Sequence, residues 1–113
     1  MMKLLGKKGE ELAAAYLAGR GYVILARNWC CQSGELDMVA KDGDTLVFIE
    51  VKTRRSALCG SPAEAVDARK QERVRLVARH YLYENRTGAA KYRFDVVAVN
   101  VTDNTIKIIK DAF

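Results

Sequence analysis

The stretch from residue 45 to residue 54 reads Thr-Leu-Val-Phe-Ile-Glu-Val-Lys-Thr-Arg. Its four consecutive apolar residues, 46–49, are typical of a strand in the middle of a sheet, where both faces are covered. Two ionisable residues follow, Glu50 and Lys52, and alternate residues of a strand share a face. Ionised groups at the end of a buried strand are costly unless they are paired or bind a metal. The stretch therefore predicts a central strand with a candidate functional site at its end.

The rest of the chain predicts the elements around this strand. Turn signals at Asp42-Gly43 join it to the strand before it. The second helix begins either at Ser61-Pro62 or at Asp67, since both match a helix start, and residues 29–34 and 54–60 are expected as loops. The order α-β-β-β-α-β-β predicts an α/β fold with a central mixed five-stranded sheet flanked by helices. The predicted helices cover residues 4–20 and the segment from one of these two starts to about residue 85. The predicted strands cover residues 22–28, 35–41, 45–53, 92–101 and 105–110.

Length and composition narrow the class of protein. With 113 residues, 50% of them hydrophobic and 29% charged, the chain is expected to form one globular domain, 1–113, with a single modest core. No apolar run approaches the roughly 20 residues that cross a bilayer, and glycine and lysine interrupt residues 1–8 before a signal-peptide core can form. We therefore expect a cytoplasmic protein without a membrane partner. Three cysteines, one histidine and no Cys-x-x-Cys pair argue against structural zinc.

The net charge of +5, from 19 basic and 14 acidic residues, favours a polyanionic partner, and nucleic acid is the expected one. Basic residues that flank the candidate site in sequence could neutralise phosphates without reading bases. The alternative is that such residues form an ordinary solvated face. The candidate phosphate contacts are Lys7, Lys8, Arg54, Arg55, Arg69, Lys70 and Arg73.

Hairpin register connects a second carboxylate, Asp37, to the same site. A two-residue turn at 42–43 places Asp37 opposite Phe48 and diagonally from Glu50, whereas a four-residue loop places it directly opposite Glu50. Either register puts Asp37, Glu50 and Lys52 on one face of the sheet. A one-residue bulge would break this alignment.

Two facing carboxylates repel each other unless a cation lies between them. Oxygen ligands on strands suit Mg²⁺ or Mn²⁺, with water and a substrate phosphate completing the coordination. Such an ion polarises a phosphoryl oxygen and lowers the pKa of bound water, and Lys52 could orient that water or stabilise the developing charge. The alternative is structural: a Glu50–Lys52 salt bridge at a strand end, with Asp37 capping a turn.

The segments Gly34-Glu35-Leu36-Asp37 and Val47-Phe48-Ile49-Glu50-Val51-Lys52-Thr53-Arg54 resemble the PD-(D/E)-x-K nuclease motif. More closely, the chain resembles the YraN family, small bacterial proteins related to archaeal Holliday junction resolvases. The resemblance covers nearly the whole chain, and Leu36 stands where the motif's name has proline. It implies a restriction-endonuclease-like three-layer core and Mg²⁺-dependent cleavage of nucleic acid.

The resemblance also implies roles for individual residues. Asp37 and Glu50 match the metal-binding acids, and Lys52 matches the catalytic lysine. Glu10 matches an acid that related resolvases contribute from the first helix, and the backbone carbonyl of Val51 is a further candidate ligand. From the sequence pattern alone, Glu10 borders the buried stripe of its helix, and a solvated acid is the interpretation that this pattern favours.

Three residues outside the motif carry simpler expectations. Trp29 fits either base stacking or packing on the sheet. His80 is expected at the surface. Asp95, two residues after Arg93 on a predicted strand, is expected in a local ion pair.

The expected function is that of a metal-dependent nuclease that cleaves DNA, branched or single-stranded. The first alternative is a non-catalytic nucleic-acid-binding or adaptor module that keeps the nuclease-like fold. The second is a partner-binding protein whose basic face is incidental. A homodimer would match the two-fold symmetry of a four-way junction, but no residue of the sequence demonstrates one.

Overall fold

The computed structural model describes residues 2–55 and 66–113, with only the backbone described for residues 2–5. Within these ranges the chain forms two helices and a five-stranded sheet in the order α-β-β-β-α-β-β, which confirms the predicted fold. The predicted start at Ser61-Pro62 and the loop over 56–60 lie outside the described residues. The elements are α1 (Met2–Gly19), β1 (Val23–Cys31), β2 (Gly34–Asp42), β3 (Thr45–Arg54), α2 (Ala68–Asn85), β4 (Lys91–Asn100) and β5 (Thr105–Ile109).

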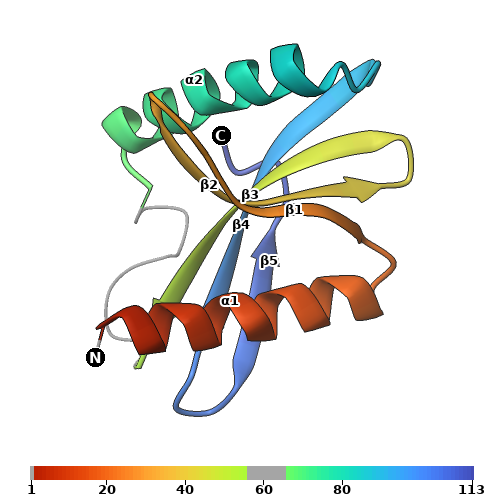
Figure 1. The fold of residues 1–113 in the computed structure, drawn as a ribbon. Helices are drawn as coiled ribbons and strands as arrows, with labels where there is room; N and C mark the ends of the chain where they lie inside the picture. The colour runs from red at the N-terminus through yellow and green to blue at the C-terminus, as the bar shows by residue number, and fades with distance from the viewer. Residues whose placement is uncertain (1, 56–65) are drawn as a thin grey trace.

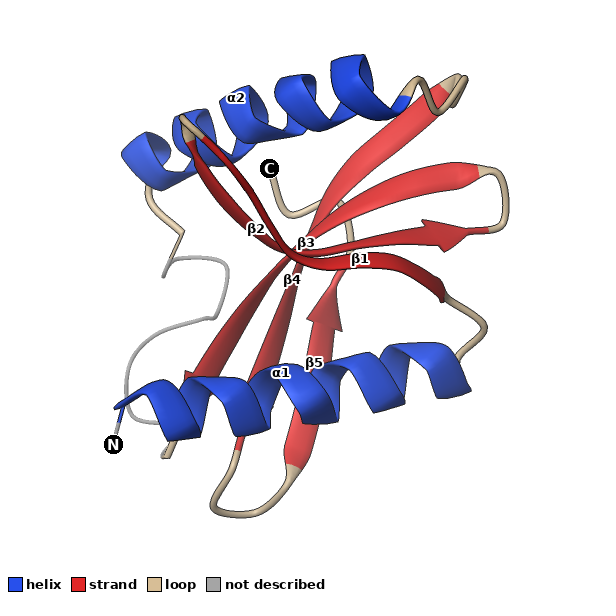
Figure 2. Ribbon diagram, viewed as in Figure 1, coloured by secondary structure: helices blue, strands red, loops and turns tan. Residues whose placement is uncertain are grey.

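The sheet separates the two helices, so the fold has three layers. The strand order is β1-β2-β3-β4-β5, and β3 and β4 pair in parallel while the other neighbours are antiparallel. Figure 1 shows α1 along one face and α2 along the other, and Figure 2 shows the twist of the strands between them. Within the described residues, neither helix combines the length and apolar character that crossing a membrane requires.

The apolar run of β3 is buried on both faces, as predicted. Val47 and Ile49 pack in the core beneath α1, whereas Leu46 and Phe48 pack in the core beneath α2. All four are at most 1% exposed. Burying each such side chain stabilises the fold by roughly 1.5–3 kcal/mol, so β3 is the strand that joins the two cores.

The turn between β2 and β3 lies one residue later than predicted. Asp42 pairs with Thr45, so the two-residue loop is Gly43-Asp44. Gly43 has a φ of 62°, the left-handed conformation that the first central position of such a hairpin favours and that glycine adopts at little cost. The resulting register, with Met38 opposite Ile49, is the one that directs Asp37 toward Glu50.

β1 is longer than predicted, because residues 29–31 pair with residues 34–36 of β2 instead of forming a loop. Trp29 and Cys31 pack against the core beneath α2, and the Trp29 ring lies edge-on to Tyr81 with 5.2 Å between centroids. The packing of these half-buried side chains outweighs the polar residues that suggested a loop. Trp29 is therefore a packing residue.

The β1–β2 hairpin rotates sharply near its middle. Leu36 packs beneath α2, but Met38, two residues later, packs beneath α1, whereas strict alternation would put both on one face. The register places Asn28 of β1 opposite Asp37, and Asn28 has a φ of 53°, outside the strand region. Beyond this point the hairpin extends toward α2 (Figure 1).

α1 approaches β3 closely at Gly9. A Cβ atom at Gly9 would lie 1.9 Å from Oγ1 of Thr53, so no larger residue fits without movement of the helix or of Thr53. Gly9 directly precedes Glu10. The contact therefore sets the position of the first half of α1 against the end of β3.

Gly9→Ala should lower the free energy of unfolding by about 1–3 kcal/mol, because the added methyl group overpacks the contact with Thr53. Urea unfolding measures the change. Gly6→Ala is the matched control: nothing lies within 4 Å of a Cβ at Gly6, so this variant should be more stable than wild type by about 0.5–1 kcal/mol. Equal stability of both variants would contradict the close approach.

Candidate functional site

The candidate site lies where β2 and β3 separate. Their ladder ends at the pair Met38–Ile49. Beyond this pair β2 extends toward α2 and β3 extends toward α1, as Figure 1 shows. We call the opening bounded by residues 34–37 of β2 and 50–53 of β3 the fork. Side chains from both helices reach it.

Asp37 is held across the fork by the backbone of β3. The Val51 N–H donates a hydrogen bond of 2.9 Å to Oδ2 of Asp37. The Asp37 carboxylate thus accepts a hydrogen bond from a backbone N–H of β3 that lies beyond Met38–Ile49, the last residue pair of β2 and β3. This bond keeps Asp37 beside Glu50 even though the hairpin rotation breaks the simple alternation of faces.

Glu50 is a buried carboxylate whose negative charge is only partly compensated by the described residues around it. Its side chain is 3% exposed, and its Oε2 lies 3.7 Å from Nζ of Lys70 on α2. Its Oε1 has no hydrogen-bond partner among the described residues. Burial, followed by the charge and hydrogen bonding of Asp37, raises the pKa of Glu50 to about 8, although Lys70 and Lys52 act in the opposite direction.

Glu10 reaches the fork from α1. Burial raises its pKa, and the Asp37 charge adds to this effect, whereas a hydrogen bond with the Asn28 side chain lowers it. Glu10 and Asn28 line a cavity of about 720 Å³ together with Lys7 and Glu35. The structure therefore places Glu10 in the same electrostatic environment as Asp37.

Asn28 was missed by sequence reasoning. Its backbone takes the left-handed conformation that asparagine tolerates better than most residues, and its side chain bonds to Glu10. An asparagine within a predicted strand is the signal that could have indicated it.

Lys52 and Val51 complete the β3 side of the fork. The Lys52 ammonium is near enough to lower the pKa of Glu50. Val51 contributes its N–H to Asp37, and its side chain packs against the core beneath α1. A role for the Val51 carbonyl as a metal ligand stays a prediction.

The donor set fits an ion that needs few protein ligands. In residues 2–55 and 66–113, no group of three or more His, Cys, Asp or Glu side chains is arranged to hold a metal by itself. Mg²⁺ commonly uses one or two carboxylates and takes its other ligands from water and substrate phosphate. Asp37 supplies one such carboxylate, and Glu50 supplies the other through Oε1, which no described residue bonds; Glu10 lies nearby.

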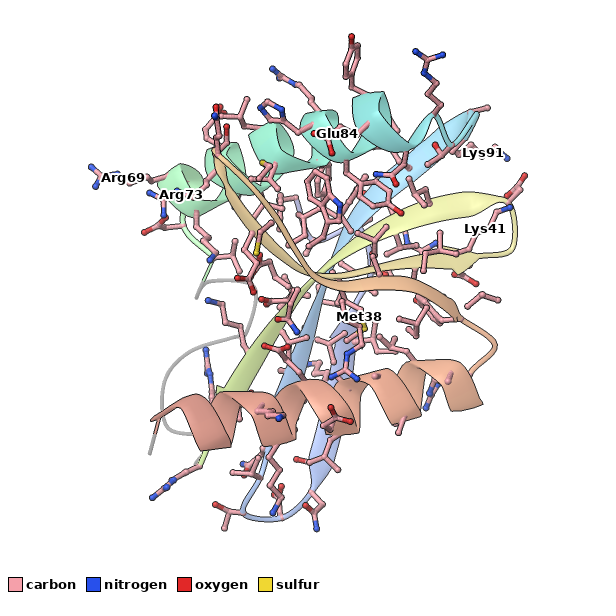
Figure 3. The ribbon with its side chains drawn as sticks, in the orientation of Figure 1. Met38, Lys41, Arg69, Arg73, Glu84 and Lys91 are labelled. Carbon is pink, nitrogen blue, oxygen red and sulfur yellow. The ribbon has the colours of Figure 1, made fainter. Side chains whose placement is uncertain are left out.

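The predicted phosphate contacts differ in their surroundings. Lys70 contacts the buried Glu50, so in this state it is the partner of an acid. Arg69 extends outward from the first turn of α2 (Figure 3), whereas the stem of the exposed Arg73 lies against Gly34 of β2. Lys7 and Lys8 are exposed on α1. At the end of β3, Arg54 is half-buried and Arg55 is exposed.

A second buried acid, Asp95, differs from Glu50 because hydrogen-bond donors and a cation surround its carboxylate. Asp95 is 0% exposed, and its Oδ1 accepts from Nε of Arg93 at 3.0 Å. The Tyr22 hydroxyl donates to its Oδ2 at 3.3 Å, and Arg93 also donates to Asp42 at 2.7 Å. The predicted ion pair of Asp95 is confirmed. The described residues offer Glu50 no comparable set of donors.

Taken together, the split sheet and its buried carboxylates define a class of small α/β protein with a polar site between two helices. Residues 9–99 match the model of "Uncharacterised protein family UPF0102". The chain is 49% identical over 110 residues to a UPF0102 protein of Syntrophus aciditrophicus, covering 96% of this chain and 87% of that one. It is 47% identical over 112 residues to a UPF0102 protein of Rhodococcus opacus, covering 96% and 95%.

A UPF0102 protein of Caldicellulosiruptor saccharolyticus is 46% identical over 113 residues, covering 96% of both chains. The chain therefore belongs to the UPF0102 family. The YraN resemblance is thereby confirmed at the level of the family. The matched region contains Glu10, Asp37, Glu50 and Lys52.

The free energy of unfolding should fall as the pH rises from about 4.5 to about 8. The pKa of Glu50 is raised from 4.5 to about 8 in the folded state, so the fold binds more protons than the unfolded chain in this window. Glu50→Gln should therefore match wild type near pH 5 and exceed it at pH 9 by on the order of 2–4 kcal/mol. Urea unfolding across this pH range, in EDTA, measures the difference.

Glu84→Gln provides the control, because Glu84 is an exposed carboxylate on the same helix as Lys70. It tests the general effect of removing one negative charge. A Glu50→Gln variant that followed wild type at every pH would contradict the cost assigned to the buried carboxylate.

Proposed function

We propose that this protein is a metal-dependent nuclease that hydrolyses phosphodiester bonds of DNA. The observation that supports this best is the Glu50 carboxylate, which is buried beside Asp37 in the fork and has one oxygen without a hydrogen-bond partner within residues 2–55 and 66–113. A buried acid of this kind is costly unless a cation compensates it. The resemblance to PD-(D/E)-x-K nucleases and archaeal Holliday junction resolvases gives the same assignment.

Asp37 and Glu50 would hold Mg²⁺ or Mn²⁺. Such an ion, when bound, polarises a phosphoryl oxygen and lowers the pKa of a coordinated water. Lys52, beside Glu50, would orient the attacking water or stabilise charge on the phosphate. Glu10, held by Asn28 at the cavity wall, would bind water on the α1 side of the fork.

The substrate we propose is branched or single-stranded DNA. The net charge of +5 and the exposed basic residues on α1, on α2 and at the end of β3 support a phosphate-rich ligand. Contacts of this type bind the backbone and do not distinguish bases. Selection of a substrate would then depend on its shape.

Glu50→Ala and Lys52→Ala should each reduce Mg²⁺-dependent cleavage by at least about 100-fold, because the first removes a ligand of the metal ion and the second removes the cation that acts on the water or the phosphate. The assay incubates branched, nicked and single-stranded DNA and RNA with Mg²⁺, with Mn²⁺ and with EDTA. Circular dichroism checks that the variants remain folded. Lys41→Ala is the control, since Lys41 is exposed on β2 at the opposite end from the fork.

Equal cleavage by wild type and both fork variants would eliminate the nuclease proposal. A non-catalytic nucleic-acid-binding module is then the second candidate, and the contact of Lys70 with Glu50 favours it, because a lysine already compensates the acid in part. That module would bind nucleic acid with a steep salt dependence and without a response to Mg²⁺.

A further inference from the structure

Lys70 lies in the first turn of α2, and hydrogen bonds fix the backbone of this turn. Asp67 caps α2 and accepts a 2.9 Å hydrogen bond from the backbone N–H of Lys70. The Gln71 side chain donates to the carbonyl of Val66 at 3.0 Å, and the Val66 side chain is 2% exposed. The backbone of this turn is therefore fixed, and freedom of movement belongs to the Lys70 side chain.

The two partners of the contact have very different surroundings. Glu50 is 3% exposed, whereas the Lys70 side chain is 38% exposed, and 3.7 Å separates Nζ from Oε2. A lysine ammonium is a compact charge on a flexible stem of four carbons. Lys70 can therefore leave Glu50 for solvent or for another anion without any change in the helix.

Lys70 lies where it would interfere with a metal ion. The oxygen of Glu50 that a divalent cation would use is Oε1, which has no hydrogen-bond partner among the described residues, and Lys70 lies 3.7 Å from the second oxygen, Oε2, of the same carboxylate. An ammonium and a divalent cation on the same carboxylate repel each other. Binding of the ion and the Lys70 contact are therefore in competition.

On the basis of the proposed nuclease function, we propose that Lys70 is a positioning residue that couples metal binding to nucleic-acid binding. Without metal, Lys70 compensates Glu50. When a divalent ion binds, Lys70 moves to a phosphate of the nucleic acid. The ion and the nucleic acid then bind cooperatively, since each favours the state in which Lys70 has left Glu50.

The first test measures Mn²⁺ binding by calorimetry without nucleic acid. Lys70→Gln should bind Mn²⁺ about five- to fifty-fold more tightly than wild type, because the competing ammonium is gone. Arg69→Gln is the matched control: it removes the same charge from the same turn, and Arg69 extends outward (Figure 3). Its Mn²⁺ affinity should stay close to that of wild type. Lys70→Arg, which keeps the charge, should also bind Mn²⁺ weakly.

The outcomes separate this proposal from the function on which it rests. If Lys70→Gln binds Mn²⁺ no more tightly than Arg69→Gln, while Glu50→Gln binds more weakly than wild type, the role of Lys70 is overturned and the metal site stands. If neither wild type nor Lys70→Gln binds Mn²⁺, or if Glu50→Gln leaves binding unchanged, both proposals fail.

The second test measures the coupling itself. In a Lys52→Ala background, which prevents cleavage under the proposed function, a short single-stranded oligonucleotide should tighten Mn²⁺ binding. Adding Lys70→Gln should remove most of this gain. An equal gain with and without Lys70 would overturn its movement to phosphate.

Discussion

The burial of the Glu50 carboxylate is the constraint on which the rest of the candidate site depends. Asp95 shows that this fold can surround a buried acid with an arginine, a tyrosine hydroxyl and a backbone N–H. In the part of the chain that the structure describes, Glu50 instead has a second carboxylate beside it, one lysine at 3.7 Å and one oxygen without a hydrogen-bond partner. A sequence selected for stability alone would compensate both acids alike. The difference between them is the strongest reason to assign the fork a function.

The shape of the fork follows from the rotation of the β1–β2 hairpin. Because Leu36 packs beneath α2 and Met38 beneath α1, β2 cannot remain paired with β3 past this point. The separation leaves the Val51 N–H without a strand partner, and the Asp37 carboxylate accepts from it. On the other side, Gly9 brings α1 close enough to β3 for Glu10 to face the same space. The rotation therefore creates the opening and also places the acids within it.

Local patterns predicted much of this arrangement. The apolar run of β3 and the turn signals after β2 were sufficient for the central strand and for the proximity of Asp37 and Glu50. The predicted position of the turn and the predicted length of β1 were wrong, because Asp42 continues the ladder and the half-buried Trp29 packs against Tyr81 of a helix far along the chain. The rotation of the β1–β2 hairpin could not be predicted from local patterns either. It depends on Leu36 packing in one core and Met38 in the other, which no periodicity of the strand indicates. Sequence spacing could not predict that Lys70 contacts Glu50, because only the crossover through α2 brings them together.

The unequal exposure of Glu50 and Lys70 determines which of them responds when the site changes. Glu50 is buried, so the cost of its charge must be met where it lies, by a proton, by Lys70 or by a cation. Only one of these can fully occupy the position at a time, and the cap at Asp67 keeps the α2 backbone from adjusting. The side chain of Lys70 is then the movable part. A phosphate at the fork would stabilise its outward position and so favour a cation on Glu50, whereas loss of the phosphate would return Lys70 to the acid.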